Sequence, residues 1–101
     1  MGLMENYEKY QKEMFDILKR KNADYATKVD SYSNFTKCEA MNICNTETGI
    51  LVRMIDKMAR ISNLTRQEAQ VKDESIKDTL LDLANYSMIL ASYIEDKKKV
   101  Q

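Results

Sequence analysis

The chain is poor in residues that break helices: its 101 residues contain no proline and only two glycines, Gly2 and Gly49. Proline inside a helix removes a backbone hydrogen bond, and glycine there costs about 1 kcal/mol relative to alanine. Long helices can therefore run without interruption. The scarcity of glycine also excludes the phosphate-binding loop and the dinucleotide-binding fingerprint, which both need several glycines.

Apolar residues recur at helical spacing in three segments. Steps of three and four in residues 3–21 predict an amphipathic helix that ends near Asn22. Its apolar positions are Leu3, Met4, Tyr7, Tyr10, Met14, Phe15, Ile17 and Leu18. A second helix is predicted from a cap at Thr46 or Thr48 to about Leu64, with an inward apolar arc. That arc consists of Leu51, Met54, Ile55, Met58 and Ile61.

The last predicted helix begins at a cap on Asp73 or Ser75, after a polar connector over residues 65–72, and runs to about Lys97. It is apolar around almost its whole circumference, which indicates burial on more than one side, in the middle of a bundle or at an oligomer interface. Between the first two helices, residues 23–47 have no long period. A short helix over residues 36–44 is expected there, with Cys38, Met41 and Ile43 inward.

These patterns predict an all-α fold in a single domain, residues 1–101. It is a small bundle of three main helices and one short helix, completed by homo-oligomerisation. The apolar-rich stretch over residues 80–94 is broken by Asp82 and Asn85 and is shorter than a membrane span. No signal peptide is recognised at the start of the sequence. We therefore expect a cytoplasmic protein that does not enter membranes.

Composition excludes several classes of chemistry. Sixteen basic residues balance sixteen acidic ones, which argues against general nucleic-acid binding. There is no histidine, so catalytic triads and histidine-ligated zinc are absent. Cys38 and Cys44 are two ligands short of a zinc site and too few for a disulfide framework, and we expect them to be reduced thiols.

Four oxygen-bearing side chains, Glu74, Asp78, Asp82 and Asn85, share one face of the last predicted helix. Glu74 and Asp78 can simply favour the positive end of the helix dipole. Asp82 and Asn85 interrupt an apolar segment, where an unpaired carboxylate costs several kcal/mol. Asp82 is therefore either an ion-pair partner of basic residues or, with Glu74 and Asp78, a ligand of Mg²⁺ or Mn²⁺.

A basic stripe lies on the second predicted helix at positions i, i+3, i+4 and i+7: Arg53, Asp56, Lys57 and Arg60. Its two guanidinium groups and one ammonium suit phosphate oxygens, although a charged helix face can also be merely solvated. In the connection that follows the first helix, Tyr32 and Phe35 can stack on a nucleobase or fold back onto the protein.

Three motifs together resemble the small phage nucleotide-modification-associated domain family, related to the all-α MazG-like nucleoside triphosphate pyrophosphohydrolases. The motifs are Lys21-Asn22-Ala23-Asp24-Tyr25, then Arg53-x-x-Asp56-Lys57-x-x-Arg60, then Asp73-Glu74-Ser75-x-x-Asp78-Thr79-Leu80-x-Asp82-Leu83-Ala84-Asn85-Tyr86. The resemblance covers roughly residues 5–95. It implies a helical bundle that assembles as a dimer or tetramer and holds a nucleoside phosphate with Mg²⁺.

Carried over to this sequence, the resemblance places Asp82 at the last acidic position of the MazG-like motif and either Asp78 or Thr79 near the acidic position before it. It implies that Asp82, Asp78 and Asp56 act in catalysis. It implies metal ligation by Glu74, Asp78 and Asp82. The ligand-binding residues would be Arg53, Lys57, Arg60, Lys21, Asn22, Asp24, Tyr25, Asn85 and Tyr86. The first acidic motif of the MazG-like enzymes is half lost here, since only Asp56 is acidic in that stretch. This departure favours phosphate binding.

Two functions follow as expectations. The first is a Mg²⁺-dependent nucleotide pyrophosphohydrolase in the cytoplasm of an infected bacterial host. The alternative is a protein that binds and sequesters a nucleotide or a nucleotide-derived immune signal without cleaving it, as an anti-defence sponge. A helical adaptor without a nucleotide is the third interpretation.

Overall fold

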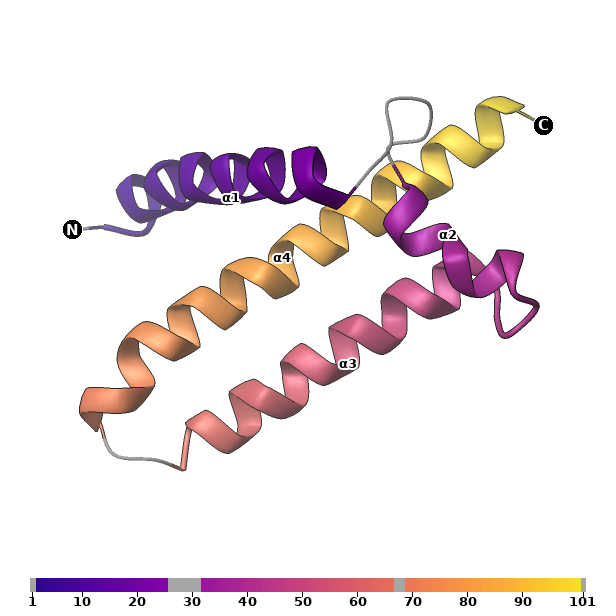
Figure 1. The fold of residues 1–101 in the computed structure, drawn as a ribbon. Coiled ribbons are helices and arrows are strands. Elements are labelled where there is room, and N and C mark those ends of the chain that lie inside the picture. The colour runs from indigo at the N-terminus through magenta and orange to yellow at the C-terminus, as the bar shows by residue number, and fades with distance from the viewer. Residues whose placement is uncertain (1, 26–31, 67–68, 101) are drawn as a thin grey trace. The chain divides into compact units, whose positions relative to one another are not determined.

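The computed structural model describes residues 2–25, 32–66 and 69–100, apart from the side chains of residues 23–25, 69–74 and 100. All regular elements in these ranges are α-helices, so the predicted all-α class is confirmed (Figure 1). The chain divides into two compact units, Met1–Asn34 and Phe35–Gln101. Among the helices described, none combines the length and the hydropathy that a membrane span requires.

Helix α1 (Leu3–Tyr25) makes up most of the first unit. The predicted end near Asn22 is wrong, because the helix continues for three further residues. Ala23, the best helix former, follows Asn22, and neither glycine nor proline stops the helix at that point.

Helix α2 (Ser33–Ala40) is the short helix of the connection, but it lies earlier than the predicted residues 36–44. Asn42, in the left-handed conformation with φ 60°, follows its end, and the N–H groups of Ile43 and Cys44 both donate to the Cys38 carbonyl at 2.9 and 3.4 Å. Of the three residues predicted to point inward, Cys38 is half-buried, whereas Met41 and Ile43 are exposed. That part of the prediction is wrong because both residues lie beyond the helix.

Helix α3 (Thr46–Leu64) ends where the sequence predicted, but it is capped by a different residue. The Asn45 side-chain oxygen accepts a hydrogen bond of 2.7 Å from the N–H of Thr48. Thr46 and Thr48 were the predicted caps and are already helical. The asparagine side chain satisfies one of the N–H groups that every helix start leaves unpaired.

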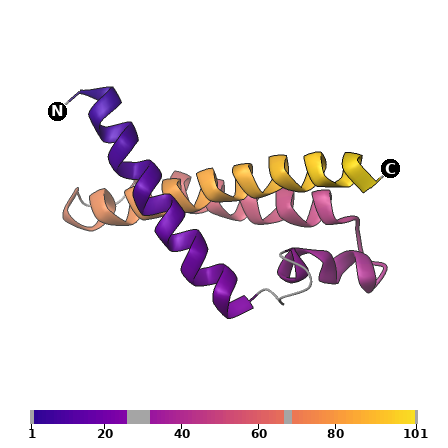
Figure 2. The ribbon, with the colours of Figure 1, turned by 90° about the horizontal axis from the view of Figure 1, so that it is seen from above.

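Helix α4 (Ala69–Val100) runs antiparallel beside α3, as the two views of Figures 1 and 2 agree. The predicted caps at Asp73 and Ser75 are wrong, because the helix already begins at Ala69 inside the predicted polar connector. No helix breaker occurs between Ala69 and Ser75, so the polar residues there extend the helix.

The contact between α3 and α4 is built on a narrow stripe. Ile50, Leu64 and Leu81 are its buried apolar residues. On α3 the less exposed positions alternate by four and three: Ile50, Met54, Lys57, Ile61 and Leu64. The broad inward arc predicted for this helix is therefore wrong in part, since Leu51, Ile55 and Met58 are exposed. The stripe that faces α4 is rotated away from the most apolar arc and includes a lysine.

Candidate functional site

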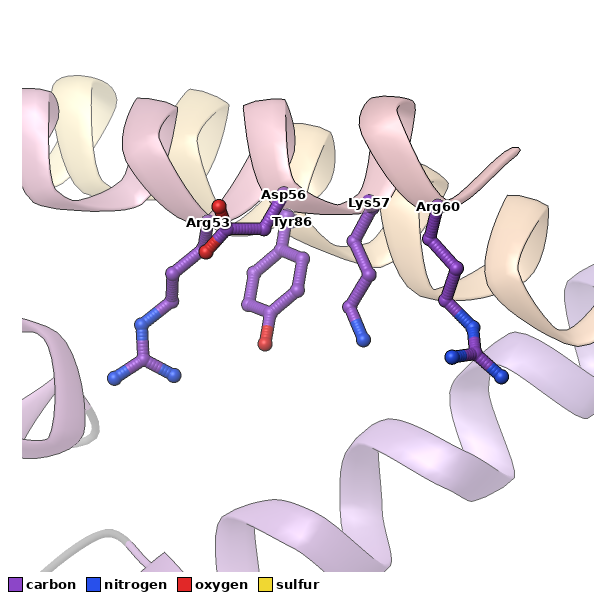
Figure 3. A pocket seen from close by; sticks show the side chains of 5 residues that line it. All are labelled: Arg53, Asp56, Lys57, Arg60 and Tyr86. Atoms are coloured by element: carbon purple, nitrogen blue, oxygen red, sulfur yellow. The ribbon is translucent and has the colours of Figure 1, made fainter. Parts of the chain in front are cut away.

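Five side chains line a pocket of about 390 Å³ on the α3–α4 pair (Figure 3). They are Arg53, Asp56, Lys57 and Arg60 of α3 and Tyr86 of α4. Steps of three and four residues place the four α3 side chains on one side of that helix. Figure 3 shows the three cationic side chains and the Tyr86 ring extending into the same space. The fold thus brings the predicted basic stripe together with one residue of the last motif.

Lys57, a member of the basic stripe, extends from α3 toward α4 and forms an ion pair with Asp82. Its Nζ lies 3.4 Å from Oδ2 of Asp82, and the two side chains are 29% and 22% exposed. Of the two interpretations of Asp82, the structure shows the ion pair with the basic stripe. Partial burial makes this pair stronger than one in open solvent, because water screens it less.

Arg60 is held by Thr79, which the sequence offered only as the alternative to Asp78 in the acidic motif. Its Nε–H donates to Oγ1 of Thr79 at 3.3 Å, and the Thr79 hydroxyl donates to the backbone carbonyl of Ser75 at 2.7 Å. Thr79 is 4% exposed, so its hydroxyl position is fixed. These two linked hydrogen bonds orient the Arg60 guanidinium and use one of its five N–H donors. The signal in the sequence was a polar residue, Thr79, directly before the apolar pair Leu80 and Leu81.

Arg53 is positioned by an aromatic ring of α2. Its Cζ lies 5.3 Å from the centre of the Phe35 ring, within cation–π range. The Phe35 ring meets the Tyr86 ring edge to face, with centres 6.1 Å apart and planes at 89°. Phe35 therefore packs against the protein, which is the second of its two interpretations. It contacts two of the residues that line the pocket, Arg53 and Tyr86.

Charge and donors in the pocket favour an anion. Three cations stand against two carboxylates, counting Asp56 and the ion-paired Asp82. Arg53 is exposed, and its guanidinium, which carries five N–H donors, makes no hydrogen bond or ion pair with the described residues. A phosphate group presents acceptors that match such donors in bidentate fashion.

The other predicted site residues take several positions. Asn85 is buried and Asp78 is exposed on α4, and neither lines the pocket. Glu74 lies in α4, but its side chain is outside the described residues, as are those of Asp24 and Tyr25 at the end of α1. Lys21 and Asn22 are exposed on α1 in the first unit, so their place in a site stays a prediction.

The described carboxylates do not form a metal site. Among the residues whose side chains are described, no three acidic or cysteine side chains gather as ligands. Asp82 instead faces the Lys57 ammonium. Because the side chain of Glu74 lies outside the described residues, the Mg²⁺ or Mn²⁺ site expected at Glu74, Asp78 and Asp82 stays a prediction.

Comparison with protein-family models matches residues 21–92 to a model described as nucleotide modification associated domain 1. The matched range contains all five pocket residues and Phe35, Thr79 and Asp82. Searches of curated proteins and of solved structures gave no match.

Proposed function

Because this chain belongs to the nucleotide modification associated domain 1 family, we propose that its α3–α4 pocket binds a nucleotide through the phosphate groups. The observation that carries the proposal is the convergence of Arg53, Lys57 and Arg60 on one pocket beside Tyr86. The family supplies the class of ligand and the pocket supplies the chemistry that recognises it.

The three cations bind phosphate in different ways. Arg53 offers a planar fork of donors held over the Phe35 ring, and Arg60 offers a second fork anchored through Thr79. Both guanidiniums are held in place before the ligand arrives, which lowers the entropy lost on binding. Lys57 contributes a point charge: its ammonium group would bind a phosphate either together with Asp82 or in place of it.

We favour retention of the nucleotide over hydrolysis. The carboxylate that the resemblance assigns to catalysis and to the metal, Asp82, neutralises Lys57 instead. This supports a protein that holds a nucleotide or a nucleotide-derived signal intact. In a phage such a protein would sequester an immune messenger.

Mg²⁺-dependent pyrophosphohydrolysis is the second candidate, and Asp56 favours it. Its carboxylate lines the pocket beside the cations and has no ion pair or hydrogen bond with the described residues. A carboxylate in that position is suited to accept a proton from water.

The test is calorimetric titration of the full-length protein with nucleoside mono-, di- and triphosphates and cyclic dinucleotides, with EDTA and with Mg²⁺. At least one nucleotide is expected to bind with EDTA present. Arg53→Ala should weaken that binding about 10- to 100-fold, because a charge-assisted hydrogen bond contributes roughly 1.5–3 kcal/mol.

Arg66→Ala is the matched control, since Arg66 is exposed near the end of α3 and does not line the pocket. It should bind as the wild type does. Equal affinities of all three proteins would remove the proposed site, and no binding of any nucleotide would favour the adaptor interpretation.

A further inference from the structure

Two thiols converge on the one glycine of α3. A Cβ built on Gly49 would lie 2.6 Å from Sγ of Cys38 and 3.9 Å from Sγ of Cys44. A side chain at this position would therefore clash with the Cys38 sulfur and contact the Cys44 sulfur. The glycine lets the end of α2 and the residues before α3 approach the first turn of α3 closely.

The backbone also brings the two cysteines together. The N–H of Cys44 donates to the carbonyl of Cys38 at 3.4 Å, across the turn that contains Asn42. The Cys38 thiol hydrogen-bonds with the Cys44 side chain and so raises the pKa of Cys44 above 9.0, with burial as a further cause. Both residues are half-buried free thiols, so small reagents can reach them.

We propose that Cys38 and Cys44 are a reversible modification site, which a small disulfide such as oxidised glutathione converts into an intramolecular disulfide. One cysteine thiolate attacks the reagent, forms a mixed disulfide and releases one reagent thiol. The second cysteine thiolate then attacks the protein sulfur of that mixed disulfide and displaces the other reagent thiol. The protein loses two protons and two electrons, and the reagent disulfide takes them up to become two thiols.

The disulfide would fasten α2, which contains Cys38, to the residues directly before α3, which contain Cys44. Cys38 lies one helical turn after Phe35, and its sulfur is 3.8 Å from the Phe35 carbonyl oxygen and 3.7 Å from the Asn45 carbonyl oxygen, either of which can accept its one proton. Closing the ring fixes the segment that carries Phe35 against the helix that carries Arg53. This inference stands on the thiols alone and does not depend on what the pocket binds.

The test incubates the full-length protein with oxidised glutathione, blocks remaining thiols with an alkylating reagent and measures the intact mass without reductant. The wild type should lose two hydrogen atoms and carry no alkyl group. Cys38→Ser and Cys44→Ser, which each keep one thiol, should instead carry one glutathione. A wild-type chain that carries two glutathiones, two alkyl groups or a disulfide to a second chain would overturn the proposal.

A second readout tests the fastening of α2 to the residues directly before α3. Oxidation should raise the midpoint of thermal unfolding by roughly 5–10 °C in the wild type, because the cross-link restricts the unfolded chain. Reductant should reverse the rise, and neither serine variant should show it. An intramolecular disulfide that leaves the midpoint unchanged would show that the two segments are not held together by it.

Discussion

At the scale of single residues, the pocket depends on Lys57, which lies at a half-buried position of α3 where an apolar side chain would be expected. Lys57 belongs to the α3 stripe that includes Ile50 and Leu64, and it extends past that stripe to Asp82. A half-buried cation is tolerated there because a carboxylate of α4 faces it. The sequence predicted both residues as functional, but it placed Lys57 on the solvated face.

Asp82→Asn should therefore strengthen metal-free anion binding. The substitution removes the negative charge that competes for Lys57, so a phosphate ligand in EDTA should bind several-fold more tightly. The free energy of unfolding should fall by about 1 kcal/mol with the loss of the ion pair. Titration calorimetry and chemical denaturation measure the two effects.

Asp78→Asn is the control for this variant, because Asp78 is exposed one turn earlier on the same helix and makes no ion pair with the described residues. It should change neither quantity. If Asp82→Asn weakened phosphate binding as strongly as Arg53→Ala does, the competition between Asp82 and the ligand would be disproved.

Gly49→Ala should be destabilising in the wild type and stabilising in a Cys38→Ala background. The new Cβ would overlap the Cys38 sulfur at 2.6 Å and force it away from its hydrogen bonds, a strain of roughly 1–3 kcal/mol. Without that sulfur, alanine should gain about 0.5–1 kcal/mol over glycine in a helix. Urea denaturation of the four proteins gives both signs, and an equal effect in the two backgrounds would rule out the proposed overlap.

At the scale of the helices, the sequence predicted which segments are helical better than where they begin and which face is covered. The lack of proline, the scarcity of glycine and the recurrence of apolar residues every three and four positions correctly predicted the all-α class and three long helices. Asn45 was missed as a cap because Thr46 and Thr48 have the same signature. The stripe of α3 was missed because several apolar arcs satisfy the same period, and only the partner helix selects one.

An ion pair between the first turn of α3 and the last turns of α4 makes stability depend on pH. Glu47 and Lys97 lie 3.0 Å apart. The pKa of Glu47 is lowered below 4.5, first by a hydrogen bond from its own backbone N–H and second by the hydrogen bond from Lys97. The contribution of Glu47 to the free energy of unfolding is therefore complete above pH 4.5 and is lost in more acidic solution. The hydrogen bond to Glu47 raises the pKa of Lys97 above 10.5, so its contribution is complete below pH 10.5 and lost above it.

Glu47→Gln should accordingly lower the unfolding midpoint by a few degrees between pH 4.5 and 10.5. The difference from the wild type should vanish as the pH falls through the lowered pKa of Glu47. Glu95→Gln, on an exposed part of α4, is the control and should follow the wild type at every pH. Thermal melts across this range measure it, and a constant difference at all pH values would assign the effect to packing.

At the scale of the whole molecule, apolar surface remains that the α3–α4 contact does not use. Ile55 is 61% and Met58 58% exposed on α3, and Met88 is 62% exposed on α4. Clusters of large exposed apolar side chains are typical of interfaces. The predicted homo-oligomer would cover them, and it remains a prediction.

We expect the protein to sediment as a dimer or larger species at micromolar concentration. Ile55→Glu should shift it toward the 11.8 kDa monomer, because a carboxylate in an apolar interface loses its hydration. Lys98→Glu, which changes charge at an exposed position of α4, should leave the association unchanged. A wild type that sediments as a monomer throughout the micromolar range would contradict the prediction.

The most direct test of the central claim is to recover the ligand itself. Excess full-length protein is incubated with Mg²⁺ and a pool of nucleoside phosphates, cyclic dinucleotides and ADP-ribose derivatives, filtered, and heated to release what it holds. Chromatography should show one species that disappears on filtration and returns intact on heating, and Arg53→Ala should fail to retain it. Product peaks would show that the pocket hydrolyses its nucleotide, and an unchanged pool would contradict nucleotide binding altogether.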